Sequence, residues 1–294
     1  MTATTSPIGF IGLGVMGAGM CGNLVRKHGG PVHVFDMNPS ALQAMVDAGA
    51  LACGSAGDVA SVAQVICLSL PGGKHVAAVC EDIAAHAAPG TIVIDLSTTS
   101  VADARSVAAS LATKNIRFAD APVARTRQAA IDGTLSIMIG APDDLFAEIA
   151  PLLRHMGSDV THCGDVGCGQ VVKLINNTLL FEQVAAIAEM MVVAERAGVS
   201  AEKLIEAVGL GSGNSFALQN HGAKAMAPRA FPERAFPSPY VLKDMGYTLE
   251  LAEQMGVDAK VARLAASYYQ AAINAGIGDK YFPAIIELVD GAAN

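Results

Sequence analysis

The most informative stretch for the fold is Ile8-Gly9-Phe10-Ile11-Gly12-Leu13-Gly14-Val15-Met16-Gly17, an apolar run that leads directly into three spaced glycines. The apolar run predicts a β-strand, and the residues from Met20 to Arg26 predict the helix that follows it. In such a unit Gly12 permits a tight turn, Gly14 lets the backbone approach a diphosphate, and Gly17 lets the helix pack closely on the strand. The stretch therefore predicts a strand–loop–helix unit that binds a dinucleotide.

A second predicted strand, Val32-His33-Val34-Phe35, ends in Asp36. An acidic side chain about 20 residues beyond such a loop accepts a hydrogen bond from the adenine ribose and repels a 2′-phosphate. The sequence therefore favours NAD over NADP as cofactor. We expect the free N–H groups of the helix N-terminus to meet the phosphates. The expected cofactor contacts at this loop are Gly12, Leu13, Gly14, Val15, Met16, Gly17 and Asp36.

Composition narrows the class of protein. The 294 residues are 52% hydrophobic and 16% charged, which fits a well-packed soluble α/β protein of two domains. A net charge of −8 argues against a nucleic-acid partner and against an anionic membrane surface. The six cysteines show neither a Cys-x-x-Cys pair nor metal-finger spacing, so we expect reduced thiols, no metal site and a cytoplasmic location. The uncharged stretch 8–25 is rich in glycine and lacks a positive flank, unlike a signal peptide or membrane span.

Strands and helices alternate along the first half of the chain. Further strands are expected near Leu51 and at 65–70, 91–95, 116–120 and 135–139, with helices at 39–48 and 56–63. This alternation predicts right-handed crossovers and a doubly wound parallel sheet. Glycines 164, 167 and 169 then mark a change of pattern, so we predict an NAD-binding Rossmann domain over residues 1–163.

The remaining residues, 164–294, predict an all-helical domain for substrate binding and oligomerisation. Apolar positions recur at helical spacing from Gln170 to Ala197, which corresponds to a helix of roughly 40 Å that can join two domains or two subunits. Further helices are expected at 201–208, 240–255, 259–275 and 283–289. Four prolines, at 228, 232, 237 and 239, predict one irregular loop between them.

Four segments, taken in order, resemble the signatures of the β-hydroxyacid dehydrogenase family. They are the glycine loop 9–17, then Asp95-Leu96-Ser97-Thr98-Thr99-Ser100, then Gly164-x-x-Gly167-x-Gly169-x-x-x-Lys173-x-x-Asn176-Asn177, and finally Lys243-Asp244. The family includes 3-hydroxyisobutyrate and tartronate semialdehyde dehydrogenases, and the resemblance runs from about residue 8 to 290. It implies a Rossmann domain followed by a helical domain, in agreement with the pattern above.

Lys173 is the predicted catalytic residue. Reducing a carbonyl by hydride transfer needs a proton donor, oxidising the alcohol needs a base, and a lysine whose pKa burial has lowered can serve both directions. A lysine near the start of a long helix is by itself more often solvated. The three preceding glycines, the resemblance, and Asn177 on the same helix face four residues on favour catalysis. The resemblance gives Asn177 an orienting role.

The resemblance also assigns the other predicted contacts. It places Thr98 against the nicotinamide, Ser97 and Asn176 nearer the substrate, and Lys243 on both the cofactor and the substrate carboxylate. Leu70, Pro71 and His75 look like further cofactor contacts. Taken without the resemblance, the same residues fit an ordinary Ser/Thr turn, a loop histidine and a surface Lys-Asp pair.

The chain departs from the family pattern at Asp120-Ala121-Pro122-Val123-Ala124-Arg125-Thr126-Arg127. Most members carry glycines where Arg125 and Thr126 stand, and the N–H groups there hold a substrate carboxylate. A guanidinium adds a fixed charge and a two-pronged donor suited to an oxyanion. This departure resembles the sulfolactaldehyde reductase branch, so we expect Arg125 and Thr126 to bind the acid group; Arg127 is left without a role.

We therefore expect an NAD-dependent oxidoreductase that interconverts a short acidic aldehyde, of the semialdehyde or sulfolactaldehyde type, and its 3-hydroxy acid or primary alcohol. Two alternatives remain open. Imine reductases share the architecture but commonly carry aspartate or tyrosine at the position of Lys173, and a non-catalytic NADH sensor would keep Gly12, Gly14 and Asp36 without needing Lys173. The family resemblance implies a homodimer or homotetramer.

Overall fold

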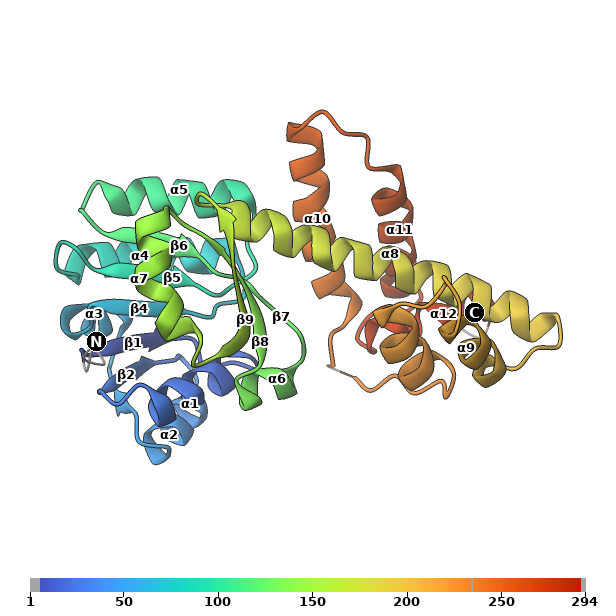
Figure 1. The fold of residues 1–294 in the computed structure, drawn as a ribbon, viewed down its shortest axis with the longest axis horizontal. Helices are drawn as coiled ribbons and strands as arrows, with labels where there is room; N and C mark the ends of the chain where they lie inside the picture. Colours follow the sequence, from blue (N-terminus) through green and yellow to red (C-terminus); the bar gives the residue numbers. More distant parts are fainter. Residues whose placement is uncertain (1–5, 234, 292–294) are drawn as a thin grey trace. The chain divides into compact units, whose positions relative to one another are not determined.

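The computed structural model describes residues 6–233 and 235–291. The chain forms two compact units, the first ending at Lys173 and the second beginning at Leu174 (Figure 1). The boundary predicted after residue 163 falls one residue before the end of the last strand, whereas this division falls inside a long helix.

The first unit is built on one nine-stranded sheet. Its strands are β1 (Ile8–Ile11), β2 (Val32–Phe35), β3 (Leu51–Ala52), β4 (Val65–Leu68), β5 (Ile92–Asp95), β6 (Arg117–Asp120), β7 (Val123–Ala124), β8 (Leu135–Gly140) and β9 (Gly157–Gly164). They lie in the order β3-β2-β1-β4-β5-β6-β8-β7, and β9 pairs with β8. The first six strands are mutually parallel and carry the strand order of a dinucleotide-binding fold.

The sheet is mixed beyond β6, which the sequence did not predict. Strand β8 runs antiparallel to β6 and β7, and β9 is parallel to β8. Hydrophobic patterning identifies a strand but not its direction, which depends on the path of the connecting chain. The expected Rossmann class is confirmed, and every pairing among β1–β6 is parallel.

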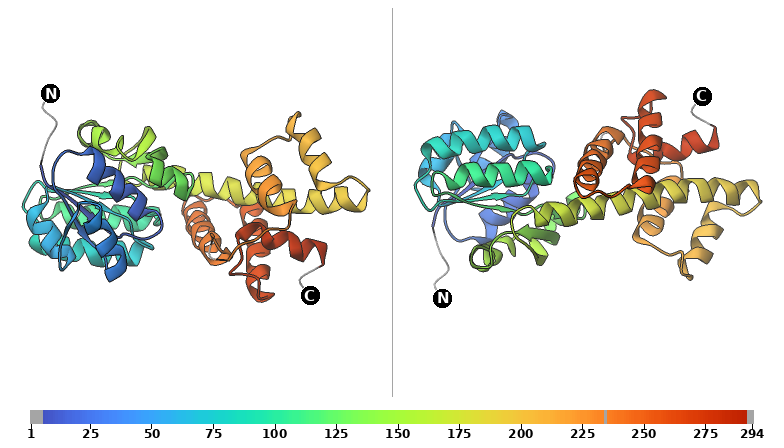
Figure 2. Two further views of the ribbon diagram at one scale, coloured as in Figure 1. Left: turned by 90° about the horizontal axis from the view of Figure 1, so that it is seen from below. Right: turned by 90° about the horizontal axis from the view of Figure 1, so that it is seen from above.

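Helices cover both faces of the sheet (Figure 2). One apolar cluster packs the sheet against α1 (Gly17–Lys27), α2 (Pro39–Asp47), α6 (Arg127–Asp132) and α7 (Asp143–Leu153), and another packs it against α3 (Ala56–Val62), α4 (Gly73–His86) and α5 (Val101–Ala112). Successive strand residues serve opposite clusters, as Phe10 and Ile11 do, because side chains alternate across a strand. Both faces are therefore apolar, and polar side chains are left to the strand ends.

The second unit is helical, as predicted. Helix α8 (Cys168–Arg196) enters it and is followed by α9 (Ala201–Gly209), the π-helix η1 (Leu218–Met226), α10 (Ser238–Gln254), α11 (Lys260–Asn274), the 3₁₀ helix η2 (Phe282–Ile285) and α12 (Ile286–Asp290). Its core centres on Phe181 of α8, whose ring contacts those of Tyr269 and Phe282 edge-on. Helix η1 is an addition to the predicted elements.

Helix α8 is also long and apolar enough, by length and composition alone, to cross a membrane. Of its most apolar stretch, 44% is buried inside the protein. The core helix of a soluble protein meets the same criterion, so this property is weak evidence for a membrane span.

All six cysteines are free thiols, and all precede Leu174. Cys21, Cys67 and Cys80 are buried against the sheet. Burial raises the pKa of Cys21 and of Cys67 to about 12, because an apolar site disfavours the charged thiolate. These thiols serve packing.

Candidate active site

The glycine loop after β1 is tightly packed at Gly12 and Gly17 and has free space at Gly14. Gly12 has φ +96°, and a Cβ there would lie 2.2 Å from the carbonyl oxygen of Ser69. A Cβ on Gly17 would lie 2.0 Å from the carbonyl oxygen of Gly12. A Cβ on Gly14, in contrast, would meet nothing within 4 Å. The loop thus leaves space at Gly14 for a diphosphate to approach the backbone.

The N-terminus of α1 carries no cap. Met16 makes no side-chain cap hydrogen bond, and the first turn holds no acidic residue. Four other helices of this unit are capped by side chains, those of Asn38, Ser55, Ser100 and Thr126. The open end of α1 therefore retains the N–H groups and positive dipole that favour an anion.

Asp36 stands at the carboxyl end of β2 with its carboxylate held by two backbone groups. Oδ2 accepts from the N–H of Leu13 at 2.5 Å, and Oδ1 accepts from the N–H of Asn38 at 2.7 Å. The acidic group is thus fixed beside the glycine loop. Together with the uncapped helix, this arrangement fits the adenine ribose and diphosphate of NAD.

Two other predicted residues meet at the ends of β4 and β5. Ser97 is buried, and its Oγ accepts from the N–H of Leu70 at 2.9 Å. The N–H of Ser97 donates to Asp95 Oδ1 at 2.9 Å. Thr98 is half-buried, whereas Pro71 and His75 are exposed at the start of α4. Ser97 and Leu70 are therefore brought together, while His75 is not joined to them.

Asp120 and Gln170 are fully buried beside these residues, and the sequence reasoning assigned neither a role. The side chain of Gln170 donates to the carbonyl oxygen of Ser97 at 2.8 Å and accepts from the N–H of Thr99 at 3.2 Å. The carboxylate of Asp120 accepts from the N–H groups of Gly167 at 2.6 Å and Gln170 at 2.8 Å. Burial raises the pKa of Asp120 to about 6, although these N–H groups oppose the rise. The position of Asp120 at the end of a predicted strand could have identified it as a site residue. No sequence pattern marks Gln170.

Lys173 lies on α8, one turn beyond Gln170, and is only 8% exposed. A solvated lysine, the ordinary alternative for this position, would be largely exposed. The structure thus gives Lys173 the burial that its predicted role requires. It belongs to the same compact unit as the glycine loop.

In the second unit, Asn177 and Lys243 converge on a third residue, Asp244. Asn177 is 7% exposed, and its Nδ2 donates to Asp244 Oδ2 at 2.8 Å. Lys243 Nζ lies 3.4 Å from Asp244 Oδ1 and 5.8 Å from the ring centre of Tyr247. Asn176 is exposed and donates to Asn177 Oδ1 at 3.2 Å. Asp244 is thus a further polar member, visible in the sequence only as the neighbour of Lys243.

Arg125 has φ +87°, in the left-handed region of the backbone that favours glycine. Its guanidinium donates to the carbonyl oxygen of Thr134 at 2.5 Å and to Ser158 Oγ at 2.9 Å, and it pairs with Asp159 at 2.7 Å. Thr126 caps α6, its Oγ1 accepting from the N–H of Ala129 at 3.3 Å. None of these partners was among the predicted site residues.

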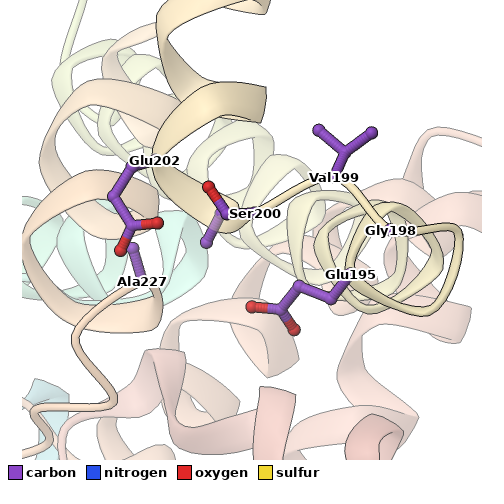
Figure 3. A pocket seen from close by; sticks show the side chains of 7 residues that line it. Glu195, Gly198, Val199, Ser200, Glu202 and Ala227 are labelled. Carbon is purple, nitrogen blue, oxygen red and sulfur yellow. The ribbon is translucent and has the colours of Figure 1, made fainter.

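Two surface hollows lie away from these groups. One, of about 350 Å³, is lined by Glu195, Gly198, Val199, Ser200, Ala201, Glu202 and Ala227 at the turn between α8 and α9 (Figure 3). Glu195 already pairs with Arg229 at 2.7 Å. The other, of about 240 Å³, lies among α1, α2 and α6 and includes Arg26 and Arg127 in its lining. Neither contains Lys173, Ser97 or Asn177.

Two family models match the chain in succession. Residues 7–164 match the NAD-binding domain of 6-phosphogluconate dehydrogenase, and residues 167–289 match the model described as NAD-binding of NADP-dependent 3-hydroxyisobutyrate dehydrogenase. The first model covers the glycine loop, Asp36 and Ser97, and the second covers Lys173, Asn177 and Lys243.

Similar proteins align over nearly their whole length. The chain is 34% identical to 2-(hydroxymethyl)glutarate dehydrogenase of Eubacterium barkeri, covering 96% of this chain and 94% of that one. It is also 34% identical to an NAD-dependent L-serine dehydrogenase of Pseudomonas aeruginosa, covering 96% and 97%. The solved structure of Mycobacterium tuberculosis 3-hydroxyisobutyrate dehydrogenase with L-serine superposes with a TM-score of 0.90 at 33% identity, covering 97% and 99%.

The models account for both units, and the relatives confirm the resemblance that four short segments indicated. The cofactor of such proteins is NAD(P), and the glycine loop and Asp36 fit NAD. The chain therefore belongs to the β-hydroxyacid dehydrogenase family, the NAD(P)-dependent oxidoreductases of the 3-hydroxyisobutyrate dehydrogenase type.

Proposed function

We propose that this enzyme interconverts a short acidic aldehyde and its 3-hydroxy acid or primary alcohol, with Lys173 as the group that moves the proton. NAD supplies the hydride chemistry when bound. The observation that carries the proposal is the burial of Lys173 in the unit that holds the glycine loop, one helical turn from a glutamine bonded to Ser97.

Lys173 has a different proposed role in each direction of the reaction. In reduction, the carbonyl oxygen takes a proton from the Lys173 ammonium as the hydride reaches the carbon. In oxidation, the neutral amine accepts the hydroxyl proton. Burial keeps water from competing with the substrate oxygen. We assign Asn177 to orienting that oxygen, with Ser97 and Asn176 beside the substrate and Thr98 beside the nicotinamide.

The relatives support a common substrate class. The compounds that they are named for, 3-hydroxyisobutyrate, L-serine and 2-(hydroxymethyl)glutarate, each carry a hydroxymethyl group on the carbon that bears a carboxylate. We infer a substrate of this kind, or its sulfonate counterpart of the sulfolactaldehyde type. Arg125 and Thr126 are the proposed selectors of the acid group, together with Lys243. The side chain of Arg125 is 46% exposed, so a substrate anion can share its guanidinium with Asp159.

The test of the reaction is turnover of purified enzyme with NAD and a panel of 3-hydroxyisobutyrate, L-serine, 2-(hydroxymethyl)glutarate and 2,3-dihydroxypropane-1-sulfonate. Lys173→Ala should lower turnover to a small residual rate while leaving NADH binding intact. Lys203→Ala, which removes an exposed lysine of α9, is the control and should leave turnover unchanged. Tight NADH binding without turnover of any substrate would instead support an NADH sensor.

The test of Arg125 compares substrates. Arg125→Gly should lower kcat/KM most for sulfonate or dicarboxylate substrates, because glycine adopts the same backbone conformation readily and the variant removes the cation that would bind the acid group. Asp159→Asn is the matched variant, since it frees the guanidinium without removing it. An equal effect of Arg125→Gly on a neutral aldehyde would refute the selector role.

We also infer a homo-oligomer, a dimer or tetramer, that forms in a reducing compartment such as the cytoplasm. Helix α8 exposes an apolar stripe, defined here as Val172, Ile175, Leu179, Met190 and Val193, each at least 40% exposed. At 100° per residue these five positions fall on one narrow face of the helix. Such a stripe supports association through α8, and the free thiols support the reducing compartment.

A further inference from the structure

The start of α8 is anchored to the sheet through a buried carboxylate. Asp120 stands at the end of β6 and is 0% exposed, and each of its two oxygens accepts an N–H group from the first turn of the helix or the residue before it. Hydrogen bonds to a carboxylate are shorter and stronger than those between neutral groups. Asp120 therefore fixes both the height and the rotation of the first turn.

Gln170 adds a second anchor, directed at β5. Its side chain is 0% exposed and reaches the backbone of Ser97 and Thr99 with one donor and one acceptor. Only a carboxamide meets both requirements, since a carboxylate has no proton to give Ser97 and an apolar side chain has neither group. A buried amide in this position is costly unless both bonds form, which fixes its orientation.

The helix start also has no room to shift. A Cβ on Gly169 would lie 2.3 Å from the carbonyl oxygen of Met138, and one on Gly140 would lie 2.4 Å from Asp120 Oδ1. From α5, Arg105 Nε donates to the carbonyl oxygen of Val166 at 3.3 Å. Backbone contact on one side and hydrogen bonds on the other hold the turn that precedes Lys173.

We propose that Gln170 and Asp120 are positioning residues for the reaction, which hold the Lys173 amine at a fixed place relative to Ser97. Lys173 follows Gln170 by three residues, so the two are neighbours on one helix face and move together. The inference rests on the proposed role of Lys173. A displacement of about 1 Å in a catalytic group costs on the order of a hundredfold in rate.

The test uses the full-length enzyme, with Gln170→Met and Gln170→Glu as variants and Gln270→Met, an exposed glutamine of α11, as the control. We expect kcat of both variants to fall by roughly tenfold to a hundredfold, with the Kd for NADH and the circular dichroism unchanged. Asp120→Asn, which keeps the shape and one acceptor, should reduce kcat less than Asp120→Ala.

A double-variant comparison separates positioning from a merely structural effect. In a Lys173→Ala background Gln170→Met should have no further effect on the residual rate, because its influence acts through the amine. The same fold loss in both backgrounds, or an unchanged kcat in the single variants, would overturn the inference. If Lys173→Ala itself retains full activity, the proposed function fails instead. Should Gln170→Met not fold, Asp120→Asn carries the same comparison.

Discussion

At the scale of single residues, Asp36 has two proposed tasks. Its carboxylate braces the N–H groups of Leu13 and Asn38 and carries the charge that repels a 2′-phosphate. Asp36→Asn keeps one acceptor and removes the charge. We expect the ratio of kcat/KM for NAD to that for NADP to fall by roughly tenfold or more, as for the loss of a charged hydrogen bond. Asp58→Asn on α3 is the control, and an unchanged ratio would contradict this role for Asp36.

His221 makes stability depend on pH. It is buried among the rings of Phe216, Tyr281 and Phe282, and its Nδ1 lies 2.8 Å from the Tyr281 hydroxyl. Burial, helped by the charge of Lys224, lowers the pKa of His221 from 6.5 to about 4. The unfolded chain therefore takes up the proton first as the pH falls.

The expected result is a stabilising contribution that is complete above pH 6.5 and is lost as the pH falls from 6.5 towards 4. The wild type should lose on the order of 2 kcal/mol over this range relative to His221→Phe. Urea unfolding at a series of pH values measures the difference, with the exposed His75→Gln as control. A difference that does not vary with pH would show that the imidazole has the same pKa in the folded and the unfolded chain.

Residue identities were predictable from sequence where a pattern marks them. Lys173, the predicted catalytic residue, is buried, and Ser97 and Leu70 meet as neighbouring strand ends do. The role of Gln170 could not be predicted, because its hydrogen-bond partners lie more than seventy residues away in the sequence. Nothing in the local sequence distinguishes it from a surface glutamine. The partners of Arg125 were missed for a similar reason, since Asp159 lies on a strand that the sequence did not predict.

At the scale of elements, a negative charge added at the uncapped N-terminus of α1 should stabilise the helix and weaken cofactor binding. Val15 precedes α1 and is 68% exposed. In Val15→Asp the new charge should favour the helix dipole by about 0.3–1 kcal/mol and raise Tm, while it repels the cofactor diphosphate and weakens NADH binding. Val261→Asp makes the same change in the exposed first turn of α11 and should leave NADH binding unchanged. Calorimetry measures Tm, and titration with NADH measures Kd. Equal Kd values for Val15→Asp and wild type would contradict an anion site at the N-terminus of α1.

The positions of the strands and helices were more predictable from the sequence than the pairing of the strands. The strands β1 to β6 and the helix α8 lie where alternation and helical spacing placed them, because both faces of the sheet and most of the helix core require apolar residues at fixed periods. Strand β9 shows no such period, since its residues from Ser158 to Gly164 are exposed or half-buried. The π-helix η1 has no sequence rule, because its extra residue per turn is imposed by tertiary packing.

At the scale of the whole molecule, the apolar stripe of α8 predicts the assembly. Leu179 lies in the middle of the stripe and is 51% exposed. Leu179→Asp should dissociate the proposed oligomer, because a charge in an apolar interface is desolvated without a partner. Light scattering coupled to gel filtration measures the mass. Leu210→Asp, at a residue 90% exposed outside the stripe, should leave the mass unchanged, and an intact oligomer in Leu179→Asp would place the interface elsewhere.

The distribution of thiols has a consequence for how unfolding can be followed. Cys21, Cys67 and Cys80 are hidden in the first unit, and the chain beyond Lys173 contains no cysteine. A thiol-trapping reagent therefore records each opening of the first unit and is blind to the second. Comparing its kinetics with the loss of whole-chain ellipticity would tell whether the dinucleotide-binding half and the helical half melt as one cooperative body or in turn.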